Sequence, residues 1–251
     1  MNDRHYKPDL RLNELKDIHK GEKCWIIGNG PSIKNYDLSK IKDEYVFVCN
    51  DFHMHDIWKE LEHPYYFESS RVSFITGNFN QWKLNRLLSN NNAKFFYRVT
   101  FRELNELFEY IPKDRVYYMR LTNDKKVYKR NFEWNVNKEF IFANSVLITF
   151  AFPIACWMGF KDIYLLGCDH TNYFNSEGEG NNAYFYDWTN MPIQFWPNPD
   201  DDNVDHTNML NSWKYISEII KPKGINIYNA SDSGRLDVFP RVKYEDIVNS
   251  P

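Results

Sequence analysis

The sequence predicts an α/β protein in which helices flank a mainly parallel sheet, with an irregular lid segment in addition. Short apolar runs alternate with amphipathic segments along the chain, and this alternation is typical of parallel strands joined by helical crossovers. The first of these runs ends in a turn with two glycines, GNGPS at residues 28–32. Open α/β sheets bind ligands at such turns, beyond the carboxyl ends of their strands.

The predicted strands are short β-rich runs bounded by turn residues or amphipathic segments. In chain order they cover residues 23–27, 45–49, 65–68, 94–98, 116–120, 163–167 and 225–228. Helical patterns are predicted at 77–89, 101–110, 145–158 and 209–220. The clearest unit is the apolar helix 145–158, because Gly159 directly follows it and glycine commonly ends a helix before the next strand.

The length of the chain favours a single domain. With 251 residues, 43% of them hydrophobic, it can bury a substantial core. We expect an N-terminal extension over residues 1–22, either packed as a helix on the outside or loose, followed by one nucleotide-binding domain over 23–251. Residues 172–205 are too polar and too proline-marked for a regular element, which predicts a functional lid or a disordered loop.

The charge and hydropathy patterns exclude several classes of partner. The 31 basic and 34 acidic residues give a net charge of −3 and are interspersed, so no strong field attracts nucleic acid. The first twenty residues lack a signal core, and no run reaches the roughly 18 apolar residues of a spanning helix. We expect a cytoplasmic protein without a transmembrane segment, while peripheral membrane association and homo-oligomerisation stay open.

The four cysteines lie within apolar segments, without the CxxC spacing of a zinc or redox site. We therefore expect buried, reduced thiols. The acidic run at residues 200–202 has two interpretations, a solvated loop or a divalent-cation site, and we predict no resident metal.

The turn after the first strand is the first candidate binding site. Gly28 and Gly30 let the backbone approach a phosphate closely, and exposed N–H groups in such a turn can cradle an anion. Asn29 can donate from its side-chain amide, Pro31 suits the first turn of a helix, and Ser32 follows it. The pattern is neither GxGxxG nor a P-loop, so a tight structural turn stays an alternative.

Polar residues at other element ends extend this candidate site. Asn50 ends the second strand, where it either reads a ribose hydroxyl or a phosphate or caps the next turn. Asn144 and Ser145 begin the apolar helix, where such side chains either cap the helix or contribute to an anion site at its positive end. Glu68 ends the third strand in the same layer.

A second polar group follows the strand after the apolar helix. This strand ends in Gly167 and then delivers Asp169, His170 and Tyr173 to the same edge of the sheet. Asp169 can accept from a sugar or base hydroxyl, whereas His170 is either a ligand contact or a structural histidine. His206 stands where the irregular segment meets the last long helix, and a neutral imidazole is well matched to taking a proton from an attacking hydroxyl.

Together these blocks resemble the bacterial sialyltransferases of glycosyltransferase family 42. The resemblance rests on the strand before GNGPS, the Cys-Asn end of the second strand, the helix start at Asn144 with GFKDIYLLGCD after it, and His206 ahead of a helix and the strand INIY. It implies a Rossmann-like domain that binds a CMP-activated nonulosonic acid, a mobile lid and no metal.

The resemblance also implies roles for single residues. Asn29 and Ser32 would contact the phosphate region of the donor, and Asn50 the nucleotide. Ser145 would contact the sugar carboxylate or the phosphate, and His206 would be the base.

Two tyrosines of that family stabilise the leaving phosphate, one just after the GxD strand and one in the lid. Here Thr171 occupies the first expected place, with Tyr173 two positions on, and the second tyrosine would be Tyr184 or Tyr186. We therefore expect Tyr173 and Tyr184 to stabilise the leaving group.

The ending NASDSGRLDVFPRVKYEDI resembles a broader group, the MptE-like or DUF115 proteins, whose archaeal namesake is an ATP-dependent pterin diphosphokinase. Since one fold supports several transfers, three functions stay open. The leading hypothesis is a glycosyltransferase that moves a sugar from a nucleotide donor, CMP-linked, to a bacterial surface glycan without a required cofactor. The alternatives are a pterin-type diphosphokinase with ATP and Mg²⁺, and a nucleotide-binding module without catalysis.

Overall fold

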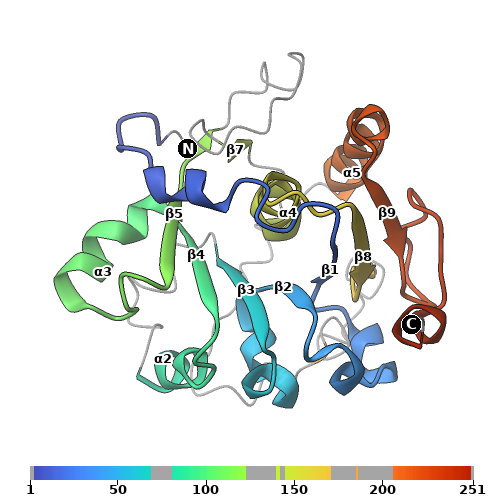
Figure 1. The fold of residues 1–251 in the computed structure, drawn as a ribbon, viewed down its shortest axis with the longest axis horizontal. Coiled ribbons are helices and arrows are strands. Elements are labelled where there is room, and N and C mark those ends of the chain that lie inside the picture. Colours follow the sequence, from blue (N-terminus) through green and yellow to red (C-terminus); the bar gives the residue numbers. More distant parts are fainter. Residues whose placement is uncertain are drawn as a thin grey trace.

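The computed structural model describes residues 3–68, 81–122, 140–141, 145–170, 185 and 206–249. Within these residues the main sheet has seven strands, all parallel, in the order β5-β4-β3-β2-β1-β8-β9 (Figure 1). The strands are β1 (Lys23–Ile27), β2 (Tyr45–Cys49), β3 (His63–Glu68), β4 (Lys94–Arg98), β5 (Val116–Met119), β8 (Asp162–Leu166) and β9 (Asn226–Asn229). A separate pair, β6 (Leu121–Thr122) and β7 (Phe140–Ile141), is also parallel. The predicted α/β class is confirmed.

The predicted strands are all present. β1, β2 and β4 have the predicted bounds, and the other four differ from prediction by two residues or fewer at either end. The central strands are buried on both faces, as in other parallel sheets, and for this reason they appear in the sequence as continuous apolar runs. The strand order reverses direction at β1, which has β2 on one side and β8 on the other, so the loop after β1 lies at the topological switch point.

Helices and helical turns cover both faces of the sheet. The α-helices are α2 (Gln81–Leu88), α3 (Arg102–Phe108), α4 (Phe152–Trp157), α5 (His206–Ile220) and α6 (Tyr244–Val248), and η8 (Leu147–Ala151) is a π-helix. The 3-10 helices are η1 (Leu10–Leu15), η2 (Pro31–Asn35), η3 (Leu38–Ile41), η4 (Asn50–Met54), η5 (Asp56–Lys59), η6 (Val99–Phe101) and η11 (Lys221–Lys223). Within the described residues, 3-10 turns thus take the place of long helices after β1 and β2.

Two hydrophobic cores lie on opposite faces of the sheet. Side chains from η1, η8, α4 and α5 pack on one face against residues such as Ile26 and Phe47. Side chains from the 3-10 turns after β1 and β2, with α2 and α6, pack on the other face against Trp25 and Val48. Because neighbouring residues of a strand point to opposite faces, each central strand contributes to both cores.

The apolar segment 145–158 does not form the regular α-helix that the sequence predicts. Its first part, η8, is a π-helix in which Phe152 N–H donates to Leu147 O, five residues back, and α4 follows. Pro153 explains the change, because proline has no N–H and its ring conflicts with the carbonyl four residues before it. π-Turns of this kind occur often at functional sites.

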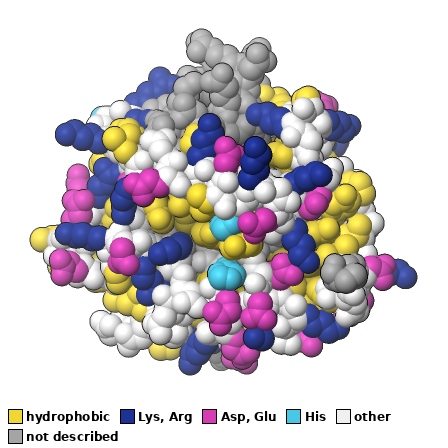
Figure 2. All heavy atoms as spheres, in the orientation of Figure 1, with side chains coloured by type: hydrophobic (Ala, Val, Ile, Leu, Met, Phe, Trp, Pro, Cys, Tyr) yellow, Lys and Arg dark blue, Asp and Glu magenta, His cyan; other side chains and the backbone are white. Residues whose placement is uncertain are grey.

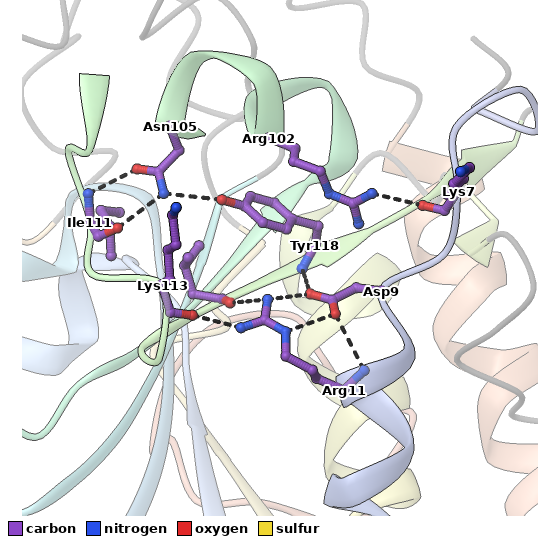
Figure 3. A network of polar contacts seen from close by, with 9 residues as sticks. Lys7, Asp9, Arg11, Arg102, Asn105, Ile111, Lys113 and Tyr118 are labelled. Carbon is purple, nitrogen blue, oxygen red and sulfur yellow. Dashed lines mark hydrogen bonds and ion pairs between the residues drawn. The ribbon is translucent and has the colours of Figure 1, made fainter. Parts of the chain in front are cut away.

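The N-terminal segment closes the edge of the sheet (Figure 3). Arg11 donates to Val116 O and Lys113 O, and Asp9 accepts from both Arg11 and the Tyr118 N–H. Further along the segment, Trp157 donates to Leu12 O over 2.8 Å, and the Leu12 side chain is buried. Residues 3–22 are thus held against β5 and α4 by polar contacts and by burial.

The exposed surface carries no large field of one sign on the face shown in Figure 2, where acidic and basic side chains intermingle. Among the residues that the structure describes, no helix has the length and apolar character needed to cross a bilayer.

His19 is buried at the amino edge of the sheet. Its Nε2 lies 2.7 Å from the Tyr65 hydroxyl, and its ring packs against Phe160 and Tyr45, with centroids 4.7 and 4.0 Å away. Burial lowers the pKa of His19, and Glu22 opposes this only in part. The folded state therefore favours the neutral imidazole of His19 over the protonated one.

This arrangement predicts acid sensitivity of the fold. An unfolded histidine has a pKa of about 6.5, so below that pH the unfolded chain binds the proton more tightly than the folded one. The contribution of His19 is complete above about pH 6.5 and declines as the pH falls below it. Urea unfolding at pH 7 and pH 5 should show a smaller loss of stability in His19→Gln than in the wild type, and equal losses would contradict this.

Candidate functional site

The loop after β1 interlocks with the end of β8. Gly28 N–H donates to Leu166 O over 2.8 Å, and Gly30 N–H donates to Gly167 O over 2.9 Å. A Cβ on Gly28 would lie 2.5 Å from Gly167 O, and one on Gly30 would overlap the Asp169 carboxylate. The glycines are therefore required by packing. Their N–H groups, which the sequence suggested as anion donors, are engaged with backbone carbonyls instead.

Asp169 joins the two loops. Its carboxylate accepts from the Ser32 N–H over 2.8 Å and from the Ser32 hydroxyl over 2.6 Å. Burial raises the pKa of Asp169, and the Ser32 hydrogen bonds act in the opposite direction. Because both Ser32 donors are used here, Ser32 keeps only oxygen lone pairs for a ligand. These suit a hydroxyl better than the phosphate that the resemblance implied.

The C-terminal segment, residues 231–235, packs against the backbone after β8 and forms hydrogen bonds with it. Gly234 has a φ of 88°, and a Cβ there would lie 2.8 Å from Asp169 Cα. Arg235 N–H donates to Asp169 O over 2.8 Å, and Ser231 Oγ accepts from Gly167 N–H over 3.0 Å. Residues 231–235 belong to the C-terminal motif for which the sequence analysis gave only a family resemblance. In the structure they hold the backbone after β8 in place.

Asn29 presents an acceptor to the site rather than a donor. Its Nδ2 donates to Cys49 O over 3.1 Å, which orients the amide, and its Oδ1 is buried without a hydrogen-bond partner among the described residues. An unpaired buried acceptor costs about 1–3 kcal/mol, so a ligand donor there is favourable. The Nδ2 group that the sequence analysis expected to donate to a phosphate thus donates to Cys49 O in this structure.

Asn50 adopts a left-handed backbone conformation, with a φ of 51°, directly after β2. Its carbonyl accepts from the Tyr66 hydroxyl over 2.6 Å. Asparagine tolerates this conformation better than most residues, which explains its occurrence at the turn into η4. The side chain is half-buried at the carboxyl edge, next to the loop that carries Asn29.

A buried charged cluster lies beyond β2 and β3. Lys83 Nζ lies 3.3 Å from Glu68 Oε1 and 3.6 Å from Asp51 Oδ1, and the Tyr66 hydroxyl oxygen lies 2.9 Å from Glu68 Oε2. Burial lowers the pKa of Lys83, but Glu68 and Asp51 outweigh it, so the net shift is upward. For Asp51 burial acts to raise the pKa, but His53 and Lys83 lower it to about 2. Asp51 and Lys83 are therefore charged near neutrality.

The sequence analysis missed Lys83 and His53. His53 is fully buried, its Nε2 lies 3.5 Å from Asp51 Oδ1, and burial lowers its pKa, so the ring is neutral near pH 7. The signal for Lys83 was present in the amphipathic pattern of α2, where the lysine falls on the buried face with Leu84 and Leu87. A lysine can be buried at this position because a carboxylate such as that of Glu68 pairs with its charge.

Ser145 lies just before η8, at the amino end of the continuous helix that η8 and α4 form. Its carbonyl accepts from Thr149 N–H over 2.9 Å, while its Oγ lies 3.5 Å from Ile148 N, too far for a strong cap. The hydroxyl is thus placed near the positive end of this helix.

His170 follows Gly167 and Asp169 at the same edge and also has a left-handed backbone, with a φ of 52°. The Trp213 indole of α5 donates to His170 Nε2 over 3.0 Å. His206 is the first residue of α5, three residues before the predicted start of that helix. The structure thus brings His170 and α5 together at the end of β8.

The remaining predicted site residues, Asn144, Tyr173 and Tyr184, and the alternative Tyr186, lie outside the described residues. So does the predicted lid over 172–205, apart from Phe185. Phe185 N–H donates to Asn29 O over 3.0 Å, and its ring packs near Phe52 and His55, with centroids 5.9 and 5.4 Å away. This one residue of the segment therefore lies against the loop after β1.

In the described part of the chain, no group of three or more His, Cys, Asp or Glu side chains is arranged to hold a metal ion. All four cysteines are free thiols, and Cys156 alone among them is partly exposed. Burial raises the pKa of Cys168 to about 12, so this thiol stays protonated and unreactive.

Comparison with solved structures finds the sialyltransferase CstII of Campylobacter jejuni in two complexes. The complex with cytidine-5'-monophosphate, described as a substrate analogue, is 16% identical to this chain with a TM-score of 0.52, and the match covers 89% of this chain and 85% of that one. The complex with CMP-3FNeuAc is 19% identical with a TM-score of 0.53, and the match covers 92% and 88%. No family model matches the chain, and no curated protein matches its sequence. The likeness shows the fold, a Rossmann-like α/β arrangement.

Asp169→Asn should destabilise the fold, because an amide cannot accept from both Ser32 donors without placing its own N–H groups against one of them. We expect a loss of about 1–3 kcal/mol in the free energy of unfolding. The control is Asp237→Asn, which removes an exposed partner of Arg241 and should cost less than about 1 kcal/mol. Urea denaturation compares the two, and equal losses would show that the Ser32 contacts do not hold the loops together.

Proposed function

We propose that the chain is a glycosyltransferase that transfers a sugar from a CMP-linked donor, such as a nonulosonic acid, to a bacterial surface glycan. The observation that carries the proposal is a row of polar residues at the carboxyl edge of β1, β2 and β3, comprising Asn29, Asn50 and Glu68, in a fold shared with a sialyltransferase bound to CMP. Ligands of open α/β sheets lie at this edge. The position of these residues supports a nucleotide donor at this edge.

The geometry supports distinct roles within this row. Asn29 Oδ1 is an acceptor that needs a donor, which suits a ribose or sugar hydroxyl, and Asn50 lies beside it. Asp169 and Ser32 link the β8 and β1 loops by two hydrogen bonds. Ser145, near the positive helix end, suits the phosphate or a carboxylate. The anionic part of the donor would thus lie toward η8, on the other side of the sheet edge from Glu68.

His206 is the proposed general base, which takes the proton from the acceptor hydroxyl as that oxygen attacks the sugar. Tyr173 and Tyr184 would donate hydrogen bonds to the leaving phosphate as negative charge develops on it. Residues 172–205 would close over the donor, with Phe185 already in contact with the loop after β1. In this proposal the reaction takes place in the cytoplasm and needs no cofactor.

CMP should stabilise the protein more than other nucleotides. A ligand at 100 times its dissociation constant adds about 2.7 kcal/mol, which corresponds to a rise in Tm of roughly 5–10 °C for a chain of this size. The measurement is a thermal-shift comparison of CMP, UDP, GDP, ADP, and ATP with Mg²⁺. A shift with ATP and Mg²⁺ alone would replace the glycosyltransferase by the diphosphokinase, and no shift with any nucleotide would refute both.

His206→Ala should lower turnover about 10²–10⁴-fold, the usual cost of removing a general base, while donor affinity changes little. The matched control is His63→Ala, at the start of β3 on the opposite edge of the sheet, which should keep wild-type turnover. Steady-state kinetics with CMP-Neu5Ac give turnover and KM for both variants. Near-wild-type turnover in His206→Ala would show that another group is the base.

A further inference from the structure

One hydrogen bond ties α5 to the end of β8. Trp213 Nε1 donates to His170 Nε2 over 3.0 Å, and the Trp213 ring is buried against Phe152 of α4 and Phe239, both edge-on. His170 is placed for this contact by its left-handed backbone, with Asp169 locked by Gly234 on one side. The contact and its surroundings are therefore built from four separate segments of the chain.

The chemistry of the two rings fixes the protonation of His170. An indole N–H is only a donor, so the Nε2 that it meets must carry a lone pair, and the ring proton of neutral His170 is on Nδ1. Protonation at Nε2 would put two N–H groups face to face and break the contact. His170 is thus a poor choice for a general base through Nε2.

The helix that carries Trp213 begins at the same edge of the sheet as His170. α5 leads through η11 into β9, and β9 runs parallel to β8, so the amino end of α5 lies at the carboxyl edge of the sheet. Position 206 is seven residues before Trp213, which is two helical turns, or about 10 Å, on the same stripe of the helix. The hydrogen bond that holds Trp213 therefore also orients the first turn of α5.

We infer that Trp213 and His170 are positioning residues: their hydrogen bond sets the amino end of α5, and with it His206, over the donor site. The catalytic part of this inference rests on the proposed function, in which His206 is the base. The structural part does not depend on the proposed function. It is that the Trp213–His170 hydrogen bond, called the clamp below, holds the first turn of α5 against the end of β8. A misplacement of a catalytic group by about 1 Å is enough to cost a large factor in rate.

The test uses substitutions that remove the hydrogen bond but keep the packing. Trp213→Phe keeps a ring and loses the N–H, whereas His170→Leu loses the acceptor. Each should lower turnover on the order of tenfold with KM for the donor nearly unchanged, and the double variant should be no worse than either single one, because the two residues act through one contact. His170→Gln, which retains an acceptor, should recover part of the rate.

The matched control is Trp157→Phe, which removes another indole hydrogen bond, to Leu12 O over 2.8 Å, away from α5. It should leave turnover unchanged. Wild-type turnover in Trp213→Phe, additive losses in the double variant, or a rise in donor KM as large as the fall in turnover would each overturn the positioning role.

Two further measurements do not depend on activity, so they separate this inference from the proposed function. Nitrogen chemical shifts of His170 should show the proton on Nδ1, and a proton on Nε2 would overturn the clamp. Hydrogen exchange of amides 210–213, which donate to the carbonyls of the first turn, should be faster in Trp213→Phe than in the wild type and unchanged in Trp157→Phe. Equal exchange in all three proteins would show that the contact does not hold the first turn of α5.

Discussion

The arrangement of the site depends on the close contact between the loops after β1 and β8. Gly28 and Gly30 lie so near to the β8 end that neither has room for a side chain, and Asp169 closes the contact by accepting twice from Ser32. Opening this contact would leave a buried carboxylate without its donors, which is costly. The loops after β1 and β8 therefore form one interlocked unit and not two independent loops.

This constraint explains how the polar groups are distributed. The N–H groups of Gly28 and Gly30 and both donors of Ser32 are directed to the end of β8, so the β1 loop offers a ligand the Asn29 Oδ1 acceptor instead of these donors. Asn29 reaches across to the end of β2, and beyond it the Lys83 ammonium balances the carboxylates of Asp51 and Glu68. On the β2 and β3 side the charged groups therefore pair with one another. The positive end of the helix formed by η8 and α4 lies on the opposite face.

Sequence patterns predicted the strands well because burial on both faces leaves a continuous apolar signal, as in β1 and β2. They placed Asn50, Asp169 and His170 at the carboxyl edge, because that follows from where strands end. They could not predict the direction of hydrogen bonds, so the Asn29 amide was expected to be free to donate to a ligand, whereas its Nδ2 donates to Cys49 O. Long-range partners such as Trp213 for His170 and Lys83 for Glu68 depend on packing between distant segments, which no local pattern encodes.

The central claim is that the carboxyl edge around β1 holds a cytidine nucleotide. A crystal structure of the protein with CMP tests it most directly. The account predicts a nucleotide beyond the carboxyl ends of β1, β2 and β8, with a hydroxyl or N–H group within hydrogen-bond distance of Asn29 Oδ1, and with the phosphate near Ser145. A nucleotide bound elsewhere, or at this edge with its phosphate against Glu68, would contradict it.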